Sequence, residues 1–488
     1  MNRIDRQHAA WDLAEAPRNY AALVAAQVAG ALLSFGSVWV AARTLGTAGY
    51  GGVAALLAAA EIVGLIAVNW SALAVARYGC DEFVQTGRIA STFWVRLAVV
   101  VPNLVLVVVT SPLWFPPLSE TLRLPSRDSW LVLSLLLAGT GWLHVQHALH
   151  GVKLLRLRGW LLALERAVVF AVMCTFAVTG TASGWRVGWL YVLAPTAASV
   201  VGILALRPFI RPMEGLDWSL LRRLLRFSMP EIPSVILFAL STRYLDAMFI
   251  AHWFSHATLG VYTVVYQVAG LTQQVPTLAG YLLMPLLMSL QADRREDSAV
   301  RFLHEVLPPL TLCWTLGCAL VAVSGASVLP WLFGPEFDDA GALLWPLMVA
   351  SAFAGPLTMG YTPIATARAR TYVTMIGIVA SGCVNLLLNW LLIPRLGLIG
   401  CAWATAAAYS VACVAVFLTV HGRETARRPW TLEATCPIVL GAVWASAFGG
   451  ALGALGVTVL AAAVIAGVHR GPVRAAARTL RHVARSVA

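Results

Sequence analysis

The side chains most able to do chemistry in this chain are the few charged ones that fall inside long apolar runs. Arg243 and Asp246 lie three residues apart in the run 230–254, so on a helix they share one face. A guanidinium in such a setting can grip an anionic group, while the neighbouring carboxylate tunes or releases it. A structural ion pair that holds two helices together is the alternative, and both interpretations stay open here.

A set of amides follows in the next apolar run. Gln267, Gln273 and Gln274 lie near Pro276, and we count them as candidate substrate-binding residues with Arg243 and Asp246. Proline removes one helical hydrogen bond and clashes with the carbonyl four residues earlier. A kink at this place would serve as a hinge or expose a carbonyl group. A static bend is the alternative.

Two further charged residues sit near the N-terminus. Glu61 falls in the middle of the run 49–76, with Asn69 about two turns further on. It is a candidate site for a coupling proton or cation, against the alternative of a protonated carboxyl that bonds to a neighbour. Arg43 falls at the outer end of the first run and is a candidate for lining an outer vestibule, unless it extends to the outer surface.

Five more polar residues carry weaker signals. His144 and His147 have the i, i+3 spacing of one helix face, and we expect a polar cavity wall there and no metal site. Arg96, Arg166 and Glu165 lie near the cytoplasmic ends of their runs. For the two arginines we expect long side chains that reach the membrane surface.

The elements that carry these residues are predicted from composition. The chain has 488 residues, of which 59% are hydrophobic and 11% charged, and its mean hydropathy is +0.78. Soluble domains carry about 25% charged residues, so this chain lacks the polar surface that water requires. Its apolar runs reach the roughly 18 residues that a spanning helix needs. We predict an all-α polytopic membrane protein with about 14 transmembrane helices. They cover about 20–43, 49–76, 92–111, 129–150, 160–180, 187–206, 230–254, 259–290, 303–331, 342–366, 372–393, 398–420, 433–451 and 453–469.

Charge placement predicts the orientation. The net charge of +12 is gathered in short clusters between alternate apolar runs, which is typical of cytoplasmic loops and argues against nucleic acid as a partner. Both termini are therefore predicted to be cytoplasmic. The first residues lack the apolar core of a signal peptide, so the first helix is expected to stay in the mature protein. The eight cysteines form no C-x-x-C pair, and neither disulfides nor a metal centre are expected.

The same pattern predicts the domain organisation. Apolar residues recur at helical spacing between Glu214 and Ser228 with arginines between them, which indicates an amphipathic helix on the cytoplasmic face. A simple extension of the seventh span is the alternative. Glycines at nearly equal offsets, Gly49 with Gly260 and Gly188 with Gly400, suggest two homologous six-helix lobes. We predict a cytoplasmic segment 1–19, a lobe 20–206, an amphipathic linker 207–229, a second lobe 230–420, two extra helices 421–469 and a basic tail 470–488.

Three stretches resemble one known family. AARTLGTAGYGG (Ala41–Gly52), followed by LAVARYG (Leu73–Gly79), is similar to the first helical hairpin of bacterial oligosaccharide-lipid flippases. These flippases belong to the multidrug/oligosaccharidyl-lipid/polysaccharide exporter superfamily. NLLLNWLLIPRLGLIGCAWAT (Asn385–Thr405) resembles a late hairpin of the same family, although Cys401 replaces a usual alanine. YLDAMFIAHWFSHATLGVY (Tyr244–Tyr262) resembles its seventh-to-eighth hairpin.

The resemblance implies a function as well as a fold. It implies a central cavity, alternating access and a cargo of undecaprenyl-pyrophosphate-linked oligosaccharide, moved across a bacterial inner membrane for polysaccharide biosynthesis. The expected partners are this lipid-linked cargo, membrane lipids, a coupling proton or cation, and polysaccharide polymerase or export machinery. We expect no cofactor and no enzymatic activity, because no Walker A motif or catalytic loop is found. A multidrug or cation antiporter of the same superfamily, a lipid II flippase and a membrane glycosyltransferase or polymerase are the alternatives.

Overall fold

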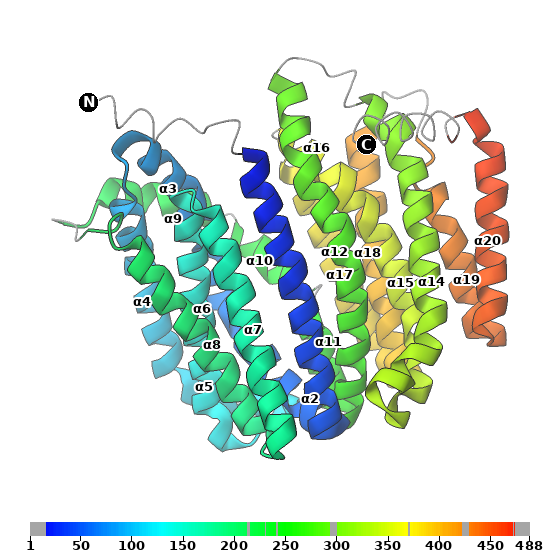
Figure 1. The fold of residues 1–488 in the computed structure, drawn as a ribbon, viewed down its shortest axis with the longest axis horizontal. Coiled ribbons are helices and arrows are strands. Elements are labelled where there is room, and N and C mark those ends of the chain that lie inside the picture. The colour runs from blue at the N-terminus through cyan, green and yellow to red at the C-terminus, as the bar shows by residue number, and fades with distance from the viewer. Residues whose placement is uncertain are drawn as a thin grey trace. The chain divides into compact units, whose positions relative to one another are not determined.

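The chain is built from helices. A computed structural model describes residues 16–211, 215–229, 231–240, 243–292, 300–368, 371–421, 429–471 and 473, and these contain no strand (Figure 1). Ten helical segments among them are long and apolar enough to cross a membrane. The predicted all-α, multi-spanning class is therefore confirmed, while the count of fourteen spans stays a prediction.

Contacts divide the chain into two compact units, residues 1–260 and 261–488. The lobes predicted at 20–206 and 230–420 are not tested by this division, because they were inferred from a sequence repeat and the two units are defined by contacts. The first unit contains α2 (Ala16–Ala67), η1 (Asn69–Ser71), α3 (Ala72–Thr86), α4 (Ala90–Val109), α5 (Ser111–Leu122), η2 (Ser126–Asp128), α6 (Ser129–Gly151), α7 (Leu155–Thr179), α8 (Gly184–Leu206), α9 (Trp218–Ser228), α10 (Glu231–Leu240) and α11 (Arg243–Trp253). Within this unit α2 packs on α7 and α6 packs on α8.

The second unit begins inside α12 (His256–Ala292), which starts in the first unit. It continues with η3 (Phe302–Val306), α14 (Leu307–Phe333), η4 (Pro335–Ala340), α15 (Gly341–Pro356), η5 (Leu357–Tyr361), α16 (Thr362–Ala367), α17 (Thr371–Leu396), α18 (Leu398–His421), η6 (Glu433–Thr435), α19 (Cys436–Phe448) and α20 (Ala451–Val468). Its centre is α15, which is buried along its whole length and packs on α14, α18 and α19. The segments η3 and η5 are single π-helical turns that join onto longer helices.

The break between the first two predicted spans is a glycine kink. Gly46 in α2 has φ 69° and ψ 175°, a backbone conformation that residues with a β-carbon rarely adopt. Shortly after it, α2 passes very close to the start of α12. A β-carbon added at Gly260 would lie 2.0 Å from the carbonyl oxygen of Thr47, and one added at Gly51 would lie 1.7 Å from the carbonyl oxygen of His256. Only residues without a side chain allow this backbone-to-backbone approach.

The predicted second span, 49–76, is not one continuous helix. It ends at Ala67, and after Val68 the chain makes one 3₁₀ turn before α3 begins. Side-chain donors satisfy the carbonyls freed at this break: the Trp70 indole donates to the Ala67 oxygen (3.1 Å) and the Ser71 hydroxyl to the Val68 oxygen (3.0 Å). Such local bonds compete with helix continuation, which is why apolar composition alone does not reveal the interruption.

The predicted amphipathic helix is α9, although its apolar face is covered by protein. Asp217 caps the helix by accepting hydrogen bonds from the backbone N–H groups of Ser219 and Leu220. The donor–acceptor distance is 2.9 Å in both bonds. Leu220 and Leu224 are buried in a cluster with residues of α3 and α4. The apolar stripe therefore docks α9 onto its own unit, and Figure 1 shows α3 and α9 together at one end.

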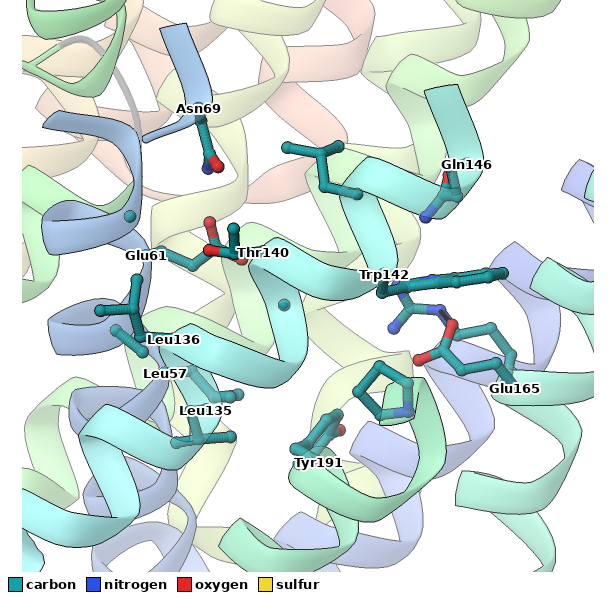
Figure 2. Close-up of a pocket in the computed structure, with 16 residues that line it drawn as sticks. Leu57, Glu61, Asn69, Leu135, Leu136, Thr140, Trp142, Gln146, Glu165 and Tyr191 are labelled. Carbon is teal, nitrogen blue, oxygen red and sulfur yellow. Dashed lines mark ion pairs between the residues drawn. The ribbon is translucent and has the colours of Figure 1, made fainter. Parts of the chain in front are cut away.

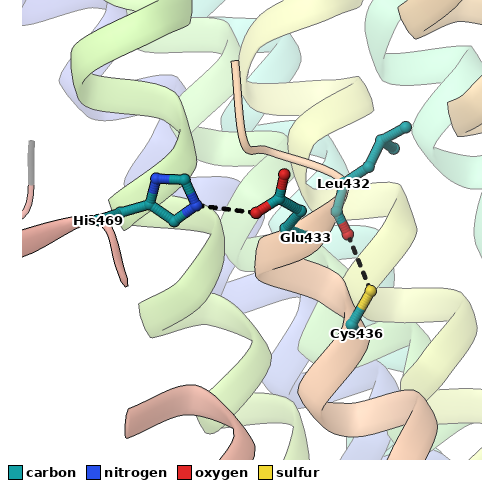
Figure 3. A network of polar contacts seen from close by, with 4 residues as sticks. All are labelled: Leu432, Glu433, Cys436 and His469. Atoms are coloured by element: carbon teal, nitrogen blue, oxygen red, sulfur yellow. Dashed lines mark hydrogen bonds and ion pairs between the residues drawn. The ribbon is translucent and has the colours of Figure 1, made fainter. Parts of the chain in front are cut away.

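The last two helices are short and joined by two glycines. Gly449 and Gly450 both have positive φ, which allows the tight turn from α19 to α20. The far ends of this hairpin are tied by His469, whose Nε2 lies 2.8 Å from Oε2 of Glu433 (Figure 3). The His469 ring also stacks on Trp430 with 4.6 Å between centroids. These contacts fix the segment after α20 to the start of α19.

Candidate functional site

A polar cavity of about 290 Å³ lies among the apolar helices of the first unit. Helices α2, α6, α7 and α8 and the 3₁₀ turn η1 form its wall (Figure 2). The polar side chains that line it come from all five of these elements: Glu61, Asn69, Thr140, Gln146, Glu165, Arg166 and Tyr191. Polar groups are costly inside a membrane protein, so their gathering around one space makes this cavity the candidate functional site.

The space exists because small residues lie where α2 and α6 face each other. Gly64 of α2 and Gly139 of α6 both line the cavity, and a β-carbon at Gly139 would meet no atom within 4 Å. Apolar residues such as Leu57, Leu135 and Leu136 complete this part of the wall. The break after Ala67 places the Asn69 side chain at the same cavity.

Glu61 is placed as its sequence position suggested. It extends from α2, and Figure 2 shows it opposite Thr140 of α6. It lines the same cavity as Asn69. The two residues that the sequence singled out therefore line one cavity, and whether they bind a coupling ion stays a prediction.

A second acid, Glu165, lines the same cavity and is only 5% exposed. Its Oε2 lies 3.3 Å from Nε of Arg166, whose side chain is 37% exposed. Adjacent positions on a helix do not face one another, so the two groups meet without forming a well-aligned hydrogen bond. Oε2 of Glu165 accepts no hydrogen bond from the described residues. The cavity thus contains two carboxyl groups and one guanidinium, and one carboxylate oxygen keeps its accepting capacity.

Beside this cavity lies a buried cluster whose nature the sequence did not reveal. Arg96 of α4 is 0% exposed, so the predicted extension of its side chain to the membrane surface is wrong. Its Nη1 lies 2.7 Å from Nδ1 of His144 in α6, and its Nε donates to the hydroxyl of Ser71 over 3.3 Å. Because a guanidinium can only donate, Nδ1 of His144 accepts and its proton is on Nε2. The Phe93 ring packs on His144 with 4.4 Å between centroids.

The three candidate glutamines of α12 differ in their surroundings. Gln273 donates to the hydroxyl of Ser351 in α15 over 3.3 Å, and Gln274 is exposed. Gln267 is half-buried on the same helix. The helix runs unbroken from His256 to Ala292 through Pro276. A role for these amides in binding cargo stays a prediction.

The remaining predicted residues lie in the first unit. Arg243 is the first residue of α11, and its side chain lies outside the described part of the chain. Asp246 is buried at 1% exposure on the same helix, which packs on α2 and α5. Arg43 is exposed on α2 just before the Gly46 kink. The choice between an anion grip and an ion pair for Arg243 and Asp246 stays open.

Solved structures show what the fold is similar to. The inward closed conformation of the lipid II flippase MurJ matches with a TM-score of 0.65 at 11% identity, over 92% of this chain and 98% of that one. An inward-facing multidrug resistance MATE family transporter of the MOP superfamily matches with a TM-score of 0.59 at 14% identity, over 80% and 93%. The MATE transporter VcmN of Vibrio cholerae in its bent form has a TM-score of 0.51 at 17% identity, over 85% and 97%. At these identities the likeness concerns the fold.

Sequence comparison gives the family. No curated protein sequence matches the chain. A family model described as polysaccharide biosynthesis protein matches residues 17–291, from the start of α2 to the end of α12. This range covers more than half of the 488 residues. The chain therefore belongs to the polysaccharide biosynthesis protein family, with the fold of the flippases and multidrug transporters of the MOP superfamily.

Proposed function

We propose that this protein is a flippase that moves a lipid-linked oligosaccharide, of the undecaprenyl-pyrophosphate type, across a bacterial inner membrane by alternating access. The family match over residues 17–291 is the observation that carries this proposal. The flippase fold, with 98% coverage of the MurJ chain, supports it. The protein acts as a transporter in this proposal, without catalysis and without a cofactor, and both termini face the cytoplasm.

Arg243 has the role of holding the anionic head group of the cargo in this proposal. It begins α11, and Asp246 follows three residues later on the same helix. A planar guanidinium donates two parallel hydrogen bonds to a phosphate, which a lysine ammonium cannot do in the same geometry. Asp246, buried in the same helix, would compete with the cargo for that guanidinium and so favour release. Arg43 and the amides of α12 complete the set of proposed cargo-binding residues.

The cavity of the first unit has the role of coupling cargo movement to an ion. Glu61 and Glu165 line one cavity, together with Asn69 and Thr140. A carboxyl group in such surroundings exchanges a proton at lower cost than it holds a permanent charge. We assign the coupling proton or cation to Glu61, which lines the cavity from α2 together with Asn69 and Thr140.

An antiporter of organic cations is the second candidate. Two carboxyl groups in one cavity would suit a cationic drug, and the MATE transporters share the fold. The guanidinium of Arg166 in the same cavity argues against this candidate, since it repels a cation. A flippase remains the better proposal because the family match concerns polysaccharide biosynthesis.

One pair of assays separates the two candidates. The gene is expressed in a strain that lacks its oligosaccharide-lipid flippase and, separately, in a strain sensitised to ethidium by loss of its drug pumps. A flippase restores surface polysaccharide and leaves ethidium sensitivity unchanged. Restored ethidium resistance without polysaccharide would contradict the proposal and favour the antiporter. Protein level is measured by immunoblot in both strains.

A further inference from the structure

An apolar groove of about 690 Å³ runs along the outside of α4. Trp94, Leu97, Ala98, Val101 and Pro102 form its floor on this helix. Gly215 and Leu216, which lead into α9, form its edge at one end. The groove therefore begins beside α9 and extends along α4 toward the middle of that helix.

The floor of this groove faces away from the protein interior. Helix α4 is a candidate membrane span in which only 28% of residues are buried inside the structure. Val101 is 47% exposed, while Arg96 and Val100 on the other face are buried. An exposed apolar surface on a spanning helix faces hydrocarbon. An acyl chain is thus the chemistry that fits the groove.

The helix that follows the edge of the groove, α9, is strongly basic. Because Leu220 and Leu224 point into the protein, the arginines between them on α9 point outward, and Arg222, Arg223 and Arg226 are all exposed. None of these three forms an ion pair with a carboxylate in the described part of the chain. Trp218, at the start of α9, is 72% exposed, which is typical of an aromatic residue at the level of lipid head groups.

Helix α9 is held firmly in this position. The Tyr78 hydroxyl of α3 donates to the carbonyl of Arg223 over 3.4 Å. The Arg77 guanidinium lies 4.9 Å from the centre of the Phe227 ring, and Tyr78 packs edge-on against the same ring. The arginines of α9 are therefore presented on a fixed surface, which lowers the entropy cost of gathering them around a ligand.

We propose that the α4 groove and the α9 arginines form a binding site for one anionic phospholipid of the surrounding bilayer. An acyl chain lies along Leu97, Val101 and Pro102, and the phosphate accepts hydrogen bonds from the arginines of α9. Charge complementarity identifies the occupant, since the groove is lined by apolar and uncharged residues and the helix that follows its edge carries three exposed cations. The site lies within the first unit and does not depend on the proposed transport function.

The test measures which lipids remain bound to the purified full-length protein. The protein is incubated in detergent with phosphatidylglycerol or phosphatidylcholine, and retained lipids are counted by native mass spectrometry. We expect preferential retention of one phosphatidylglycerol, with an affinity that falls about fivefold for each arginine removed. The triple variant Arg222→Gln/Arg223→Gln/Arg226→Gln should lose this preference. The matched control is Arg127→Gln/Arg186→Gln/Arg395→Gln, which removes equal charge from exposed positions on other segments and should keep it.

A second variant tests the groove itself. Val101→Trp fills the floor from an exposed position and so leaves the interior packing unchanged. It should abolish retention of phosphatidylglycerol although all three arginines are present. Equal retention of both lipids, or unchanged retention by the triple variant, overturns the proposal. Preferential capture of undecaprenyl phosphate over phosphatidylglycerol in a competition experiment also overturns it, because the occupant is then a cargo-type lipid.

Discussion

Arg96 and His144 form a hydrogen-bonded pair in the interior of the first unit, with 2.7 Å between Nη1 and Nδ1. Arg96 is fully buried, and no carboxylate among the described residues forms an ion pair with it. The neutral imidazole accepts from the guanidinium and therefore takes the place that an acid would usually hold. The remaining nitrogens, Nη2 of Arg96 and Nε2 of His144, have no hydrogen-bond partner in the described structure.

This pair should be coupled energetically. His144→Leu removes the acceptor and leaves a buried guanidinium group unsatisfied, so it should cost about 1–3 kcal/mol of stability. His144→Gln keeps an acceptor and should cost less. The double variant Arg96→Met/His144→Leu should be more stable than the sum of the two single losses predicts. Thermal unfolding in detergent of the unsubstituted protein, Arg96→Met, His144→Leu and the double variant measures this cycle. Simple additivity of the stability losses would show that the two residues act independently.

Glu61→Gln should stop transport while the protein still folds. The amide keeps the shape and hydrogen bonds of the protonated carboxyl, but it cannot release a proton. Surface polysaccharide in the complemented strain should fall to the level of the empty vector at normal protein abundance. Glu120→Gln, an exposed acid on α5 outside the cavity, is the matched control and should retain full export. Full export by Glu61→Gln would remove Glu61 from the proposed coupling site.

Arg243→Ala should leave the protein inserted and stop export of the polysaccharide. A charge in the hydrocarbon core costs at least about 2.5–3.5 kcal/mol on insertion scales, so this residue needs a partner or a cargo to offset it. Arg243→Lys should keep part of the activity, since the charge remains and the bidentate geometry does not. Complementation with an immunoblot measures both effects. Loss of protein together with export would instead indicate a structural pair with Asp246.

The cap of α9 should make the docking of this helix sensitive to acid. Hydrogen bonds from the backbone N–H of Leu220 and from Ser219 hold the pKa of the Asp217 carboxyl below its usual range. A depressed pKa in the folded state means that the stabilisation is present above the unfolded value and is lost as the pH falls through the folded value. Amide hydrogen exchange in α9 should therefore rise at acidic pH. Asp217→Ala should show the faster exchange already at neutral pH, with a loss of about 1 kcal/mol.

Much of the fold was predictable because hydropathy follows the spans directly. The predicted runs 129–150 and 398–420 correspond to α6 (Ser129–Gly151) and α18 (Leu398–His421) within two residues at each end. The 3₁₀ break after Ala67 was missed, because it depends on hydrogen bonds from Trp70 and Ser71 and not on a change in composition. The helix α5 was missed because its three prolines favour a loop in sequence. In the structure Pro112 occupies the helix start, where proline is tolerated, while Pro116 and Pro117 lie inside the helix.

The candidate site was predictable only in part. Glu61 and Asn69 share an apolar run, which was enough to expect them near each other, although Asn69 reaches the cavity from the 3₁₀ turn after Ala67 and not from the same helix. The Arg96 pair with His144 was not predictable, since both faces of α4 are apolar and no pattern distinguishes the inner face from the outer one. Depth in the membrane follows from sequence position, but direction around the helix axis does not. For the same reason the sequence placed Glu165 only by its depth, near the cytoplasmic end of its run, and did not indicate that it lines the cavity.

The crossing of α2 and α12 at Gly51 and Gly260 has a consequence for the interpretation of mutational scans. Any side chain at either position collides with backbone, which cannot be relieved by a rotamer change. Both glycines should score as intolerant to every substitution, alanine included, although neither lines the polar cavity. An activity screen without a measure of protein abundance would assign them to the transport machinery. Their sensitivity instead reflects the short distance between the backbones of α2 and α12.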